Sequence, residues 1–204
     1  MSQLHSHQQA RQQQPQTQQQ APQRTEPVPQ QFPTRSYLSQ NVRTASIQRL
    51  NRCLADSLVL HSQAKYAHWN VKGPQFYSLH LLFDEIAEEL ESHIDEIGER
   101  ITTLGGQAVA TTYTAASSSS IAPLSTTAVN GIEFVEMLAD RMATHDANLG
   151  QDIRAATQDG DVDTADLLNE VSREVGMLRW FLEAHLQGQP RQAGRSQQHQ
   201  LSQQ

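Results

Sequence analysis

The chain has 204 residues, a length that suits one domain with terminal extensions. Its 15 basic and 22 acidic side chains give a net charge of −7. This negative charge disfavours binding to the phosphates of nucleic acid or membranes. A single cysteine excludes an internal disulfide, and no apolar run approaches a membrane span or secretory signal, so we expect a cytoplasmic protein, with association with the nucleoid left open.

Both ends of the chain are rich in glutamine. Residues 1–36 contain 13 glutamines and five prolines and have almost no large apolar side chains. Such segments bury too little surface to offset the entropy of ordering them, so we predict disordered tails over 1–36 and 188–204. The tails hold five arginines against one glutamate, which leaves a charge of −11 on the predicted folded domain, 37–187. This acidic domain is long enough for a sizeable core and attracts cations.

Four stretches carry apolar residues at helical spacing, and none alternates as a half-buried strand does. Gly73-Pro74 and Gly105-Gly106 end the first two, and Asp163-Thr164 offers an N-cap to the fourth. A Ser/Thr/Ala-rich connection of about 25 residues joins the second to the third, so it is expected to cross the bundle and hold a short helix. This order predicts an all-α, ferritin-like four-helix bundle with a long crossover, although periodicity alone fits any four-helix bundle. The predicted helices cover about 44–70, 78–104, 131–157 and 163–186.

The second predicted helix carries a row of carboxylates, led by a histidine, beside its apolar face. On a helical wheel with His80 at 0°, the angular positions are about +40° for Asp84, about +60° for Asp95 and about +100° for Glu99. A charge row by itself is most often a solvated face, and that reading stays open for the row alone. However, His80 with Asp84 and Asp95 with Glu99 have i, i+4 spacing, so each pair can offer two ligands to one metal ion. His68 comes near this flank after the Gly-Pro corner.

Distance decides how these pairs can act. Asp84 and Asp95 lie about 16 Å apart along a helix axis, whereas metal ligands lie within about 2.5 Å of the ion. The two pairs therefore cannot share an ion within one chain. They can share one if a second copy of this helix lies antiparallel to the first, and a two-fold axis then generates two identical sites. Imidazole and carboxylate ligands without a thiolate suit Fe(II), Mn(II) or Zn(II).

The stretches AHWNVKGPQFYSLHLLFDE and HIDEIGERITTLGG resemble the signature of the Dps family, the miniferritins. The resemblance covers 37–187 and extends to DTADLL (163–168) and RWFLEAHL (179–186). It implies hollow shells of twelve four-helix subunits that oxidise Fe(II) between two-fold-related subunits, preferentially with hydrogen peroxide, and store ferric mineral. It also implies that Trp69 lies beside the iron and absorbs stray oxidising equivalents. The implied iron ligands are His68, His80 and Asp84 from one subunit, with Asp95 and Glu99 from its partner.

Further acidic residues match secondary sites of the family. Acidic pores at three-fold axes admit iron in that family, and Asp152, Asp161 and Asp166 match the region that lines them. Glu88 and Glu91 continue the acidic flank and are either mineral nucleation sites or part of a solvated cavity wall.

Other polar residues are expected to have structural roles. His61 either extends the metal site or is a packed or exposed histidine. Arg100 and Arg141 are expected in salt bridges between subunits, and Cys53 in the core. Three further histidines of the core are also read as structural: His93, His145 and His185.

Two rival functions stay open at the level of sequence. One is a structural or DNA-protecting shell whose sites hold zinc and oxidise iron poorly. The other is an ordinary helical-bundle interaction protein, which would be a monomer or dimer. The tails contain no lysine, so weak or absent DNA binding is expected near physiological salt.

Overall fold

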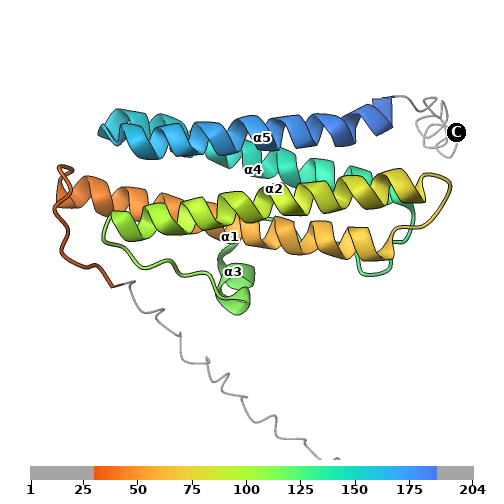
Figure 1. The fold of residues 1–204 in the computed structure, drawn as a ribbon, viewed down its shortest axis with the longest axis horizontal. Coiled ribbons are helices and arrows are strands. Elements are labelled where there is room, and N and C mark those ends of the chain that lie inside the picture. Colours follow the sequence, from red (N-terminus) through yellow and green to blue (C-terminus); the bar gives the residue numbers. More distant parts are fainter. Residues whose placement is uncertain (1–29, 188–204) are drawn as a thin grey trace, which may run out of the picture.

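The computed structural model describes residues 30–187, which form two antiparallel helix pairs packed against each other (Figure 1). A short fifth helix lies in the crossover between the two pairs and packs on the outside of the first. No strand is present among these residues, and none of their helices is long and apolar enough to cross a membrane. The pairs are α1 (Gln40–Asn70) with α2 (Phe76–Thr103) and α4 (Gly131–Asp159) with α5 (Val162–Gln187); the crossover helix is α3 (Thr112–Ser118).

The four predicted long helices and the predicted short crossover helix are confirmed, but the start of the first helix and the cap of the fourth long helix differ from the prediction. The first helix begins four residues early because the Ser39 side chain accepts a hydrogen bond from the backbone N–H of Val42. The fourth long helix is capped by Asp161, not by Asp163-Thr164 as predicted. The Oδ1 atom of Asp161 accepts a hydrogen bond from the backbone N–H of Thr164 at 3.2 Å.

The end of α2 shows where the N-terminal prediction was wrong. Gly105 has φ +81°, and a Cβ atom there would lie 2.5 Å from the carbonyl oxygen of Phe32. The Phe32 N–H in turn donates to the Gly105 carbonyl at 2.7 Å. Residues 30–36 therefore pack against the bundle, although the sequence assigned them to a disordered tail. The rest of both predicted tails lies outside the described residues.

The core is formed by apolar side chains from all four long helices. Phe83 and Phe134 are fully buried and meet edge to face, with ring centroids 6.2 Å apart. Burying side chains of this size contributes roughly 1.5–3 kcal/mol each. Cys53 is buried here as predicted, and burial raises the pKa of its thiol. His93 and His145 are buried as well, in line with a structural reading.

Acid is expected to destabilise the bundle through His145. Burial lowers the pKa of this imidazole to about 4, although Asp56 and Asp146 oppose that effect and His93 adds to it. Because the unfolded chain takes up this proton below about pH 6.5, the contribution to stability is complete above that pH and declines toward pH 4. The expected loss from this group between pH 7.5 and 5 is about 2 kcal/mol. Thermal unfolding of a His145→Gln variant should show a smaller loss, and an equal loss would contradict the assignment.

Candidate metal centre

Two histidines join the end of α1 to the start of α2. The Nδ1–H of His68 donates to the carbonyl oxygen of His80, and the Nδ1–H of His80 donates to the carbonyl oxygen of His68, both at 2.8 Å. The rings stack with centroids 3.7 Å apart and an interplanar angle of 18°. The His68 carbonyl lies in the last turn of α1, where helix carbonyls lack helical partners, so this contact also completes the helix end. The Gly-Pro corner thus brings the predicted pair together.

This arrangement sets the chemistry of both rings. A carbonyl oxygen only accepts hydrogen bonds, so each Nδ1 carries the proton. In the neutral imidazole, Nε2 then has a free lone pair and can bind a metal ion. Histidine ligands in metalloproteins commonly donate their other N–H to a carbonyl in this way. The donor set of His68 and His80 therefore fits a divalent transition metal.

Asp84 lies beside His68, but it forms an ion pair with a lysine. Its Oδ1 lies 3.8 Å from Nδ1 of His68 and accepts a hydrogen bond from Nζ of Lys65 at 2.5 Å. The hydrogen bond from Lys65 lowers the pKa of the Asp84 carboxyl below its ordinary value. Lys65 was not among the site residues predicted from the sequence, although its position three residues before His68 places it on the same face of α1. A metal ion that binds Asp84 must compete with this ammonium group.

Removing the competing charge is expected to strengthen metal binding. A Lys65→Gln variant of the assembled protein should bind Zn(II) or Co(II) a few-fold more tightly near pH 7 in a calorimetric titration. Both side chains are about one-third exposed, so the effect is modest. Lys72→Gln is the matched control, because Lys72 is exposed and follows the end of α1. Unchanged or weaker binding by Lys65→Gln would show that Lys65 does not compete.

The second predicted pair lies far along α2 from the first. Asp95 and Glu99 are both exposed and line a groove of about 770 Å³. The groove also receives Leu54 and Leu58 from α1, so a carboxylate row lies beside an apolar wall. Glu88 and Glu91 line the same groove. The side chains in this groove suit a surface that another protein chain covers.

A single chain does not complete a metal site among residues 30–187. No three His, Cys, Asp or Glu side chains of this part lie close enough together to hold a metal ion. α2 is continuous from Phe76 to Thr103, so the two clusters stand at fixed positions about 16 Å apart along it. Within one chain, α2 therefore separates two imidazoles with a nearby carboxylate from a pair of exposed carboxylates.

Trp69 and His61 lie along a second groove. This groove, of about 840 Å³, runs between α1 and the crossover, and His61, Lys65 and Trp69 line it at successive turns of α1. The Trp69 side chain is 67% exposed. Nothing in this geometry assigns His61 to the His68 and His80 cluster, so its role as a ligand stays an open prediction.

The three predicted pore carboxylates have different environments. Asp166 is exposed near the start of α5, and Asp152 forms an ion pair with Arg52 at 3.0 Å. Asp161 is fully buried, and its Oδ1 bonds to Arg100 at 2.7 Å. Burial by itself raises the pKa of Asp161, but the nearby hydroxyls of Ser46 and Thr164, the Thr164 N–H and the Arg100 charge outweigh it, so the pKa is lowered.

Two sequence predictions are corrected by these contacts. A fully buried carboxylate is unsuited to line a pore, so Asp161 is a helix cap and ion-pair partner. Arg100 forms this ion pair within its own chain, not between subunits. Arg141 likewise donates to carbonyl oxygens of its own chain, those of Met137, Ala122 and Pro123.

The bundle and its crossover define a class of protein. The sequence model of the ferritin-like domain family matches residues 47–191, which are most of the chain. This match agrees with the two helix pairs and the long crossover seen in Figure 1. The chain is thus a ferritin-like protein.

Individual relatives narrow the class to one family. The chain is 33% identical to the DNA protection during starvation protein of Agrobacterium fabrum, over 76% of this chain and 95% of the relative. It is 39% identical to DNA protection during starvation protein 2 of Bacillus anthracis, over 69% and 95%. The structure of DpsC from Streptomyces coelicolor superposes with a TM-score of 0.75 at 32% identity, over 78% and 94%. The chain belongs to the Dps family, the DNA protection during starvation proteins, as the sequence motifs implied.

Proposed function

We propose that this chain is a ferroxidase and iron-storage subunit. It oxidises Fe(II), preferentially with hydrogen peroxide, between two-fold-related copies and keeps the ferric product inside a shell of twelve subunits. The proposal is supported by the separation along α2 of two clusters, neither of which completes a metal site alone: the first is His68, His80 and Asp84, and the second is Asp95 and Glu99. We propose that each cluster is one half of a metal site. The Dps protein of Vibrio cholerae, a structural neighbour with a TM-score of 0.70 and 28% identity over 73% of this chain and 93% of that one, is described as a ferritin-like diiron-carboxylate protein.

An antiparallel copy of α2 would join the half-sites. The imidazole cluster of one chain then faces the carboxylate pair of the other, and the two-fold axis repeats this at the opposite end. Both grooves flank this surface of α1 and α2, and a partner would cover them. The proposed ligands of the Fe(II) substrate are His68, His80 and Asp84 of one subunit, with the partner's Asp95 and the partner's Glu99.

The ligand types suit oxidation of iron. Anionic oxygen ligands favour the harder Fe(III) ion over Fe(II), and so assist the loss of an electron. Two Fe(II) ions supply one electron each to one hydrogen peroxide molecule, whose O–O bond breaks. With two protons, the products are two Fe(III) ions and two water molecules, so no hydroxyl radical is released. Trp69 is proposed to take up stray oxidising equivalents.

Secondary roles are proposed for four further carboxylates. Asp166 is exposed and Asp152 is partly exposed, so they are the pore candidates that stay open for iron entry. Glu88 and Glu91 lie on the acidic side of the first groove and are proposed to collect iron or ferric ions near the oxidation site. Little DNA binding is proposed near physiological salt, because the predicted folded domain is strongly acidic. A gel shift that persists at that salt would contradict this.

A second function is supported by the two imidazoles. A half-site of His68 and His80 with one carboxylate also suits Zn(II). The protein would then be a structural or DNA-protecting shell with zinc-occupied sites and weak oxidation of iron. Metal analysis after purification and competition between zinc and iron separate these two functions.

The proposed function is tested under anaerobic conditions. Metal-free protein receives Fe(II) and then hydrogen peroxide, while ferric absorbance is followed. We expect fast oxidation at about two Fe(II) per peroxide with a soluble product, because iron is oxidised inside the assembly. An Asp95→Ala/Glu99→Ala double variant should lose most of this rate.

The control must carry the same change of charge. Glu85→Ala/Glu89→Ala removes two exposed carboxylates from α2 that do not line the groove, and it should keep the wild-type rate. Slow oxidation that neither double variant changes would reject the ferroxidase function. The zinc-holding shell would then be the better account.

A further inference from the structure

The second half of the crossover, residues 119–129, has neither helix nor strand, yet it runs along the bundle. Backbone groups in such a segment need partners other than a helix or sheet ladder. Side chains of α1 and α4 supply them. Gln63 donates to the carbonyl of Ala122, Tyr66 to that of Thr126, and Arg141 to those of Ala122 and Pro123.

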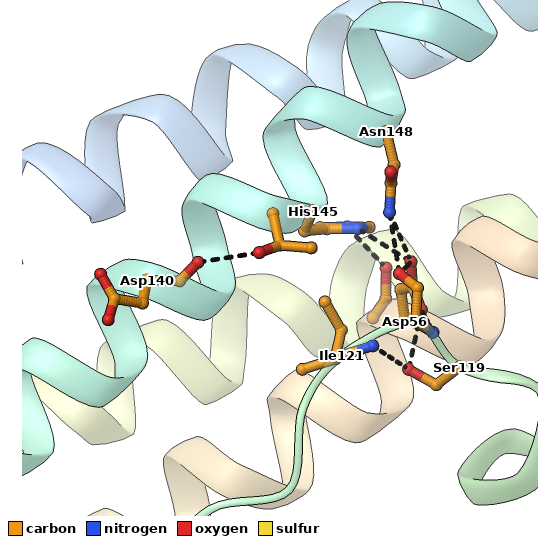
Figure 2. A network of polar contacts seen from close by, with 9 residues as sticks. Asp56, Ser119, Ile121, Asp140, His145 and Asn148 are labelled. Atoms are coloured by element: carbon orange, nitrogen blue, oxygen red, sulfur yellow. Dashed lines mark hydrogen bonds and ion pairs between the residues drawn. The ribbon is translucent and has the colours of Figure 1, made fainter.

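Asp56 is the most heavily bonded of these anchors (Figure 2). Its Oδ1 accepts hydrogen bonds from the Ser119 hydroxyl and the Ser120 backbone N–H, both at 2.7 Å. Its Oδ2 accepts from the Ser120 hydroxyl at 2.9 Å and from the Asn148 amide on α4 at 3.2 Å. Asn148 also donates to the Ser120 hydroxyl at 2.9 Å. One carboxylate thus joins α1, the crossover and α4.

Among residues 30–187, no lysine or arginine forms an ion pair with this buried carboxylate. Asp56 is 3% exposed, and the basic side chain beside it is His145, whose Nδ1 lies 4.0 Å from Oδ2. His145 bonds to Ser57 through Nε2, and burial keeps it neutral near pH 7. A buried anion without a counter-charge is costly unless hydrogen bonds surround it. The four donors therefore hold the Asp56 charge, and the charge in turn holds the crossover.

The anchored crossover forms a wall of the proposed interface. Ile121, Pro123, Leu124 and Thr126 line the second groove, opposite α1. Leu58 lines both this groove and the groove that contains Asp95 and Glu99, so the two surfaces are continuous. A second copy that covers the first groove and extends past Leu58 would therefore also contact the crossover.

We propose that Asp56 is a positioning residue for the intersubunit centre. Its hydrogen bonds to Ser119 and Ser120 fix the crossover as the wall against which a second copy seats. Through that wall, Asp56 controls how firmly the partner's Asp95 and the partner's Glu99 are held opposite His80. The inference rests on the proposed function for its effect on iron oxidation, but its effect on subunit association does not depend on that activity.

The test uses full-length Asp56→Asn, which keeps the size of the side chain but removes its charge and brings an N–H₂ group among donors. We expect helix content close to wild type, with association of subunits weakened on the order of tenfold. Sedimentation and the Fe(II) oxidation rate per subunit are measured over a range of protein concentration. The rate should fall in dilute protein and recover in concentrated protein, which a defect in the metal ligands would not produce.

The matched control is Asp140→Asn, which removes an exposed carboxylate from α4 and should behave as wild type. If Asp56→Asn does not fold, Ser119→Ala/Ser120→Ala removes hydroxyl donors from the crossover without changing α1. Weakened association of that variant supports the proposal. Wild-type association and rate in a folded Asp56→Asn, or in the serine variant, would overturn it. If wild-type protein fails to oxidise iron, the sedimentation result alone decides.

Discussion

Two inactive variants are expected to restore activity to each other when they assemble together. One variant, His80→Ala/Asp84→Asn, lacks the imidazole half-site, and the other, Asp95→Ala/Glu99→Ala, lacks the carboxylate half-site. Each homo-oligomer should lose most of its Fe(II) oxidation. Co-expressed, they should recover about a quarter of the wild-type rate, because half of the random dimers are mixed and each mixed dimer has one intact site.

The expected recovery of a quarter of the wild-type rate follows from the positions of the two half-sites on α2. In a mixed dimer, the intact imidazole half-site of one chain faces the intact carboxylate half-site of the other, and the opposite site lacks both. Co-expression of each variant with itself is the control for protein level. Co-expression without any recovery would show that the half-sites do not meet across an interface. The effect is large because removal of several ligands abolishes the site instead of weakening it.

A loss of stability is the second large effect expected, and it comes from Asp161. This carboxylate is fully buried, bonds to Arg100 and caps α5 through Thr164. Asp161→Ala leaves the Arg100 guanidinium, which is 19% exposed, without its main partner, and leaves the helix start uncapped. We expect roughly 3 kcal/mol of destabilisation and a lower midpoint of thermal unfolding by several degrees.

Asp166 is the comparison for Asp161, because a carboxylate that lines an iron entry pore is expected to affect iron uptake and not stability. Asp166→Ala removes an exposed carboxylate of α5 that should matter little for stability. If Asp166 lines an entry pore, this variant should slow the first phase of iron uptake while its unfolding midpoint stays near wild type. An Asp161→Ala protein as stable as wild type would contradict the structural role of Asp161. Unchanged iron uptake by Asp166→Ala would remove it from the pore.

Sequence reasoning succeeded where one helix defines the geometry. The spacing of apolar residues located all four long helices, whereas the i, i+4 pairs on α2 stay predictions as metal ligands. Their separation depends only on the rise per residue of a helix, so the need for a second chain follows from the spacing of the residues alone. The His68 and His80 contact was also anticipated, because only a short Gly-Pro corner separates them.

Sequence reasoning failed where residues distant in the chain meet. Asp161 was predicted as a pore residue because it matches the region that lines the acidic pores of the Dps family, yet it is buried and forms an ion pair with Arg100 of another helix. Residues 30–36 have the composition of a tail, yet they bond to the end of α2. Asp56 carries no local signal, because its partners lie in an aperiodic crossover more than sixty residues later.

The sequence by itself determined the helices and the family, and it predicted the two half-sites. These depend on local periodicity and on the spacing of ligands along a single helix, which are visible in the chain. Only the tertiary structure decided that Lys65 forms an ion pair with Asp84, that Asp161 is buried and that Asp56 forms hydrogen bonds to the crossover. Each of these depends on which elements pack together and on how a buried charge finds its hydrogen-bond partners, and no local pattern specifies that.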